Sequence, residues 1–87
     1  MIRVIYAGAL RELAGVAEDV LRLPGGEVGL GELLRRLVAL RPGLALAERV
    51  SPMIWVFVNG RQVLPTDSVR VRDGDTVLLM PPLYEGG

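Results

Sequence analysis

The sequence contains no cysteine, no histidine and no lysine, so all ten of its basic residues are arginines. Without cysteine the chain cannot form a disulfide, a thiol nucleophile, a persulfide or a soft metal site. Without histidine and lysine it also lacks the usual general bases and the amine that forms Schiff bases. Carboxylates and tyrosines remain, and no motif brings two of them together. We therefore predict a protein that holds no metal or cofactor of its own and performs no catalysis with its own side chains.

The charge balance and the hydropathy pattern argue against two classes of partner. Ten arginines are matched by ten acidic residues, so the formal net charge is 0, which disfavours a protein that binds nucleic acid by neutralising phosphates. The longest purely apolar run, residues 53–58, is far too short to span a bilayer. Because 51% of its 87 residues are hydrophobic, the chain can fold around a core. We predict one soluble, cytoplasmic domain without a membrane or nucleic-acid partner.

Hydrophobic periodicity predicts one main helix and several short strands. Apolar residues at positions 30, 33, 34, 37, 38 and 40 form the stripe of an amphipathic helix. A helical turn is expected at 10–14, and one or two further turns at 44–50. Strands are expected at 1–6, 19–23, 53–58, 61–63, 69–71 and 76–80, with turn sequences such as Asn59-Gly60 and Asp73-Gly74 between them. A mixed sheet packed on one main helix, an α+β design, is the most economical arrangement of these elements.

Two of the expected strands are apolar on both faces. One helix can cover only one face of a small sheet, whereas strands of this kind usually belong to sheets covered on both sides. We therefore expect an exposed apolar patch on the second face, which on a soluble protein commonly marks a partner interface. The alternative is that loops and the 44–50 segment fold over it. The residues concerned are Met53, Trp55 and Phe57 against Ile54, Val56 and Val58, and Val77 and Leu79 against Leu78 and Met80.

The end of the sequence has a pattern of its own. Pro81 and Pro82 cannot donate hydrogen bonds to a sheet, so we expect a folded domain of residues 1–82 and a flexible tail of residues 83–87. The tail reaches about 17 Å when extended and consists of Leu83, Tyr84, Glu85, Gly86 and Gly87. Glycines can thread a narrow channel in another protein because they have no side chain. A carboxylate delivered this way can be adenylated by a partner, and sulfide can then replace AMP to leave a thiocarboxylate. The alternative is a frayed terminus.

Five short motifs occur in order along the chain: Arg11-Glu12-Leu13-Ala14-Gly15, Val58-Asn59-Gly60, Asp73-Gly74-Asp75, Pro81-Pro82 and Gly86-Gly87. In this order and at this length, the chain resembles the MoaD family of sulfur carriers, the small subunits of molybdopterin synthase, which are related to ubiquitin. The resemblance runs over the whole chain. It implies a β-grasp fold, in which the first and last strands lie side by side at the centre of the sheet.

The resemblance also implies a function and a set of site residues. An E1-like enzyme would use ATP and Mg²⁺ to adenylate Gly87, and a sulfur donor would convert the adenylate to a thiocarboxylate. The tail would then enter the active site of the large subunit, where its sulfur builds the dithiolene of molybdopterin from cyclic pyranopterin monophosphate. Met80, Pro81, Pro82 and Arg11 would contact partner proteins. In this family two small subunits sit at the ends of a dimer of large subunits, which supply the catalytic side chains.

The tail departs from the family pattern, and other functions stay open. The family usually places two residues between the prolines and the glycines, whereas this chain has three. The extra residue adds about 3.3 to 3.6 Å of reach and puts the carboxylate of Glu85 beside the reacting end. The same tail could supply sulfur for tRNA thiolation or another pterin pathway, or could attach to protein lysines as a ubiquitin-like modifier. A passive β-grasp interaction domain is the remaining alternative.

Charged residues elsewhere leave further alternatives. Arg11 could pair with an acidic group on the activating enzyme or could simply be solvated. Arg70 and Arg72 alternate on one strand face, where they could meet an acidic partner or protect an edge strand from aggregation, and we favour the edge role. Asp73 and Asp75 lie at a turn without further ligands, which makes a poor Mg²⁺ site.

Overall fold

The computed structural model describes residues 1–45 and 54–81. Most of the helical stretch expected at 44–50, together with Met53, Pro82 and the tail, lies outside these residues, as does the expected boundary between domain and tail. The elements are β1 (Ile2–Tyr6), α1 (Ala9–Ala14), β2 (Glu18–Leu21), a 3-10 turn (Pro24–Gly26), β3 (Glu27–Gly29), α2 (Leu30–Leu40), β4 (Trp55–Val58), β5 (Arg61–Val63), β6 (Arg70–Arg72) and β7 (Thr76–Met80).

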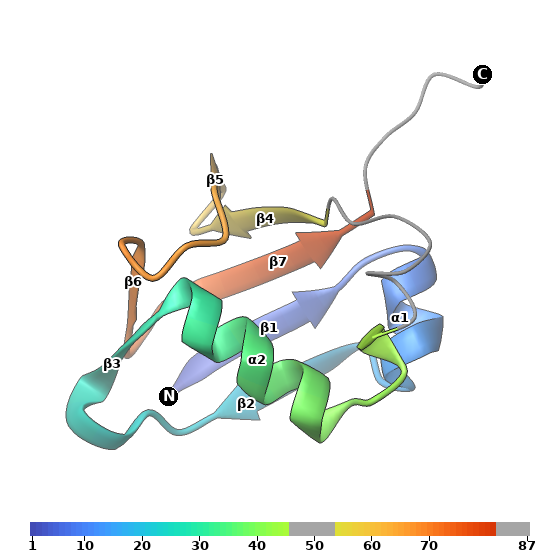
Figure 1. The fold of residues 1–87 in the computed structure, drawn as a ribbon, viewed down its shortest axis with the longest axis horizontal. Helices are drawn as coiled ribbons and strands as arrows, with labels where there is room; N and C mark the ends of the chain where they lie inside the picture. The colour runs from blue at the N-terminus through green and yellow to red at the C-terminus, as the bar shows by residue number, and fades with distance from the viewer. Residues whose placement is uncertain (46–53, 82–87) are drawn as a thin grey trace.

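The main sheet has five strands in the order β2-β1-β7-β4-β5, and α2 crosses one of its faces (Figure 1). β1 and β7 pair in parallel at its centre, with Val4 opposite Val77, while the other neighbours pair antiparallel. The mixed sheet on one helix, with the first and last strands side by side, confirms the expected β-grasp architecture. Because the two central strands are parallel, both begin at one end of the sheet, and β7 ends at the opposite end with Met80.

The structure corrects several of the expected strands. β4 begins at Trp55, so Ile54, which was expected within the 53–58 strand, lies before it. β2 ends at Leu21, because Leu23 turns into the core just before the 3-10 turn. The strand expected at 69–71 is β6, one residue later, and it pairs with β3 in a separate two-stranded sheet. No periodic pattern predicts β3, which is only three residues long and ends in glycine.

The core lies between α2 and the main sheet. Leu30, Leu33 and Leu37 form the buried stripe of α2, as the helical periodicity predicts. Each fully buried leucine contributes about 2 to 3 kcal/mol of hydrophobic stabilisation. Both sheets, α1 and the loops complete the core with Ile2, Val4, Tyr6, Leu10, Ala14, Leu23, Val28, Leu44, Val56, Val71, Val77 and Leu79.

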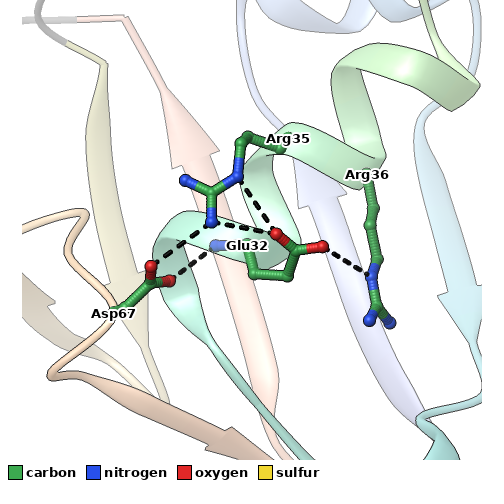
Figure 2. Close-up of polar contacts among 4 residues, drawn as sticks. All are labelled: Glu32, Arg35, Arg36 and Asp67. Carbon is green, nitrogen blue, oxygen red and sulfur yellow. Dashed lines mark hydrogen bonds and ion pairs between the residues drawn. The ribbon is translucent and has the colours of Figure 1, made fainter.

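The loop between β5 and β6 holds the first turn of α2 through Asp67 (Figure 2). The residue before the helix is Gly29, which has no side chain to cap it, and Asp67 Oδ1 instead accepts a hydrogen bond from the Glu32 N–H at 2.8 Å. Asp67 Oδ2 also lies 3.3 Å from Arg35 Nη2. The Glu32 N–H, followed by Arg35, lowers the pKa of Asp67. A Cβ at Gly29 or Gly31 would lie 2.6 or 2.9 Å from Asp67 Oδ1, so this loop can approach only a glycine-lined helix start.

A nearly buried carboxylate ties β2 to β1 and to the end of α2. Asp19 accepts a hydrogen bond from the Tyr6 hydroxyl at 2.8 Å and two from Arg41, at 3.1 Å from Nε and 2.6 Å from Nη2. Its side chain is only 9% exposed. The hydrogen bonds from Arg41, followed by that from Tyr6, hold the pKa of Asp19 below its ordinary value although burial opposes them. Burial and the bond to Asp19 raise the pKa of Tyr6.

We expect Tyr6→Phe to lower the free energy of unfolding by about 2 kcal/mol, because it removes one hydrogen bond to a charged group. Arg41→Ala should cost more, since it leaves Asp19 without its counter-ion. Because the folded pKa of Asp19 is depressed, its contribution is present above the unfolded pKa of about 4 and is lost as pH falls through the folded value. Urea unfolding between pH 2 and pH 7 measures both effects. If the free energy of unfolding of the wild type falls no more steeply between pH 7 and pH 2 than that of Arg41→Ala, this role of Asp19 is contradicted.

Candidate functional site

An open apolar face occupies the side of the main sheet opposite α2. Ile5 of β1, Leu78 of β7 and Phe57 of β4 lie opposite one another in neighbouring strands. Trp55 and Met80 form the next pair along the same face. All five side chains are partly exposed, and none belongs to the buried core. We call these five residues the open apolar face.

This face confirms the expectation that β4 and β7 are apolar on both sides. Val56, Val77 and Leu79 point into the core, so Trp55, Phe57, Leu78 and Met80 are left on the second side. Trp55 is therefore a partly exposed residue of this face and not a member of the buried core. Sequence reasoning did not assign Ile5 to the patch, although its alternation with the buried residues of β1 was a usable signal. Most of the 44–50 segment, the alternative cover expected for this face, lies outside the described residues, which stop at Ala45 and resume at Ile54.

Charged and polar residues border the open apolar face. Arg3 and Glu18 form an ion pair on the strands at its β2 side, where Ile5 lies opposite Glu18. The hydrogen bond from Arg3 lowers the pKa of Glu18. On the other side, Gln62 of the edge strand β5 lies opposite Phe57. An apolar centre with a polar rim is the usual anatomy of a protein–protein interface.

The open apolar face extends to the end of β7, which is followed by Pro81. Met80, the last residue of the strand, belongs to this face. On the neighbouring strand the Ala7 N–H donates to the Leu79 carbonyl at 2.9 Å. Gly8 lies against Pro81, since a Cβ there would be 3.5 Å from Pro81 Cγ. The corner between β1 and α1 therefore packs beside the point at which the chain leaves the sheet.

Arg11 lies on α1, at this same end of the sheet (Figure 1). It borders an open hollow of about 710 Å³ that Gly8, Glu12, Gly15, Val16 and Ala17 also line. Arg11 and Glu12 are both exposed. Of the residues expected to meet a partner, Arg11, Met80 and Pro81 thus lie at the same end of the main sheet. Pro82 and the tail residues Leu83, Tyr84, Glu85, Gly86 and Gly87 lie outside the described residues.

Chemically, these features make a binding surface. Within residues 1–45 and 54–81, no three acidic side chains gather closely enough to hold a metal ion. In the same two ranges no helix has the length and apolar character needed to cross a membrane. An apolar face with a charged rim, next to the end of β7, is suited to binding a partner protein.

Comparison with known sequences shows similarity over nearly the whole chain. The ThiS family model matches residues 4–86. The molybdopterin synthase sulfur carrier subunit of Chlamydomonas reinhardtii is 34% identical over 85 residues, which cover 98% of each chain.

Solved structures show the same fold. A putative molybdopterin converting factor, subunit 1, from Pyrococcus furiosus is 26% identical with a TM-score of 0.77, covering 94% of this chain and 97% of that one. SAMP1 of Haloferax volcanii, a small archaeal modifier protein, is also 26% identical, with a TM-score of 0.76 and coverage of 99% and 98%. At 18% identity, a chain in the Helicobacter pylori complex of molybdopterin-converting factor subunits 1 and 2 shares the fold, with a TM-score of 0.65 and coverage of 98% and 97%.

Proposed function

The chain belongs to the ThiS family, and on this basis we propose that it is the sulfur-carrier subunit of a molybdopterin synthase. The observation that carries the proposal is the continuity between the open apolar face and the strand end at Met80, from which a Gly-Gly tail extends. The similarity to the carrier subunit of Chlamydomonas reinhardtii, which spans nearly the full length of both chains, supports it.

In the proposed reaction the chain itself is the carrier of the sulfur. A carboxylate oxygen of Gly87 attacks the α-phosphate of ATP on an E1-like enzyme, and pyrophosphate leaves. A sulfide equivalent from a sulfur donor then displaces AMP, so the C–O bond to AMP breaks and a C–S bond forms. The resulting thiocarboxylate gives its sulfur to cyclic pyranopterin monophosphate, and water returns Gly87 to a carboxylate. ATP and Mg²⁺ belong to the activating enzyme, so this chain needs no bound cofactor.

The tail is proposed to work because it is long enough to reach a partner's active site and narrow enough at its glycines to enter it. Leu83, Tyr84 and Glu85 extend the chain beyond Pro82, and Gly86 and Gly87 pass through a channel too narrow for side chains. Glu85 places a negative charge close to the reacting carboxylate, so a cationic side chain on the partner must neutralise it when the phosphates of ATP are near. This chain therefore fits partners whose channel carries an arginine or lysine at that depth.

The large subunit of the synthase is the proposed partner of the open apolar face. Burial of Trp55, Phe57 and Leu78 would supply the hydrophobic centre of the interface, since large apolar side chains dominate binding energies. Met80, Pro81, Pro82 and Arg11 would contact the partner around the root of the tail. Two carriers on a dimer of large subunits, in the cytoplasm, form the proposed assembly, and the large subunit supplies the catalytic side chains.

Thiol alkylation of the protein isolated from its native host tests the carrier function. Because the chain has no cysteine, an alkylated sulfur that maps to the C-terminal peptide can only be a thiocarboxylate. We expect the label at Gly87 and no label on protein made without an activating enzyme. An unlabelled terminus, on protein that also fails to react with an activating enzyme and ATP, contradicts the proposal.

A second candidate is a ubiquitin-like modifier, which the structural similarity to SAMP1 favours. It retains the activated Gly87 but transfers the acyl group to an amine of another protein, so an amide forms and no sulfur is delivered. Lysine-linked chains of this protein on itself are excluded because it has no lysine. Covalent adducts of the chain in host extracts, found by mass spectrometry at target lysines, would favour this candidate, whereas a co-purifying large subunit favours the first. Supply of sulfur to tRNA would be recognised by the molecule that receives the transferred sulfur, which would be a tRNA and not a pterin.

A further inference from the structure

A second surface feature lies at the end of the main sheet remote from Met80. A hollow of about 400 Å³ opens between β5 and β6, and its lining includes Arg61, Arg70, Arg72, Val58, Val63 and Val69. We call it the arginine groove. In the sheet, Val58 lies opposite Val77, whereas Trp55 lies opposite Met80. The groove is therefore beside the beginning of β7, away from the strand end at which the tail starts (Figure 1).

Positive charge exceeds negative charge in the arginine groove. Arg70 and Arg72 form their ion pairs with the same carboxylate, that of Glu27, at 3.4 and 3.1 Å. The charge of Arg70 also helps the Glu32 N–H to lower the pKa of Asp67. Within residues 1–45 and 54–81, Arg61 makes no ion pair. The distance to Glu27 from Arg70 is long for a charge-assisted bond, which normally measures about 2.7–2.9 Å. These guanidinium groups thus retain donors for an additional carboxylate.

The one acidic residue that lines the groove is already engaged. Asp75 Oδ1 accepts from Asn59 Nδ2 at 2.9 Å, and Asp75 Oδ2 accepts from the Arg72 N–H at 2.8 Å. Both oxygens therefore stabilise the neighbouring turns. Asp75 does not form an ion pair with any of the three arginines within the described ranges. The lining contributes three cations and one committed anion, and Glu27 beside it offsets part of the charge of Arg70 and Arg72, so Arg61 is the cation that most favours an anionic occupant.

The groove also has an apolar component. Val58, Val63 and Val69 are partly buried and pack against the core, so each still presents some surface. Arginine is well suited to this setting, because its planar guanidinium binds a carboxylate through two parallel hydrogen bonds and is weakly hydrated. An occupant that combines carboxylates with an aliphatic side chain matches both parts of the lining.

We propose that the arginine groove docks an acidic, leucine- or valine-containing segment of a partner protein. Its carboxylates pair with Arg61, Arg70 and Arg72, and its aliphatic side chain lies on the valines. A protein segment fits better than a nucleic acid, because the chain as a whole has no net positive charge with which to attract a polyanion. The site lies apart from the open apolar face, so both can be occupied together. Partner binding at the arginine groove would be a function of Arg70 and Arg72 in addition to the protection of an edge strand expected from the sequence.

Backbone-amide NMR of the full ¹⁵N-labelled chain tests this site. The probe is the peptide acetyl-Asp-Leu-Glu-Leu-Asp-amide, and its Asn/Gln counterpart is the uncharged control. We expect saturable shifts at Val58, Arg61, Val63 and the β6 amides with the acidic peptide, and none with the control. Arg61→Ser should weaken binding by about two- to fivefold, the range for an exposed ion pair. Arg22→Ser, which changes an exposed arginine outside the groove, should leave the affinity unchanged.

Three outcomes would overturn the proposal. The first is an absence of shifts in the groove at millimolar peptide. The second is equal weakening by Arg61→Ser and Arg22→Ser, which would indicate general charge attraction. The third is an equal response to inorganic phosphate, which would indicate a simple anion site. None of these measurements involves Gly87, so failure here leaves the sulfur-carrier proposal intact, and loss of the carrier proposal leaves this site intact.

Discussion

Deletion of Gly87 is expected to reduce sulfur transfer to background while the chain still binds its large subunit. The shortened chain ends in Gly86, so a carboxylate remains, but Glu85 then directly precedes the reacting residue, and its side chain does not fit a channel that admits only glycine. The terminus is therefore held out of place, and misplacement of a reacting atom by as little as 1 Å can cost about 100-fold in rate. Binding should persist because Trp55, Phe57, Leu78 and Met80 on the open apolar face are unchanged. Transfer from the deletion variant to the recipient, together with calorimetric binding to the large subunit, measures both halves of the prediction.

Deletion of Glu85 provides the matched control. It shortens the tail by the same one residue but keeps the Gly-Gly end, and it leaves two residues between the prolines and the glycines, as is usual in the MoaD family. We expect this variant to retain sulfur transfer. Equal loss in both variants would mean that length alone matters and not the glycine end. Full transfer in both would contradict the carrier mechanism and favour a passive interaction domain.

The second large effect is expected from Leu78→Asp in the centre of the open apolar face. Leu78 lies between Ile5 and Phe57 across the central strands, so a carboxylate there would be buried without a partner in the complex. We expect affinity for the large subunit to fall by about 30-fold or more, as for a central hot-spot residue. The isolated domain should lose only about 1 kcal/mol of stability, because the side chain points away from α2 and the core.

Leu64→Asp is the control for this substitution. Leu64 is 75% exposed and lies in the loop after β5, outside the open apolar face. The same change of side chain there should alter neither binding nor the unfolding midpoint appreciably. Affinity is measured by calorimetry with the large subunit, and stability by thermal unfolding of the carrier alone. Unimpaired binding by Leu78→Asp, with the fold intact, would exclude this face as the interface.

Local sequence pattern predicted the elements whose periodicity is strong. The stripe from Leu30 to Leu40 matches α2 in both of its bounds, because an amphipathic helix needs only near neighbours to define its buried face. The two-sided apolar character of β4 and β7 likewise predicted a surplus face. β3 was not predicted because a strand of three residues is too short to show an alternating pattern. Its pairing with β6 also depends on residues about forty positions away in the sequence.

Side-chain networks could not be predicted in this way. Asp19 joins Tyr6 to Arg41, and Asp67 caps a helix that begins more than thirty residues earlier. Nothing near any of these residues in the sequence marks its partner. Gly29 and Gly31 are explained only once the Asp67 loop is seen against the helix, because the contact that excludes a Cβ comes from that loop.

Composition alone shows that residues 1–87 contain no cysteine, histidine or lysine, and the order of residues places two glycines together at positions 86 and 87. Folding changes neither property. Which apolar face stays open, and where it lies, depended instead on how the strands pair and pack. Parallel pairing of β1 with β7 brings Ile5 beside Leu78 and carries the strand end to Met80. That pairing joins the two ends of the domain, and a contact at such separation depends on packing of the whole core rather than on any local pattern.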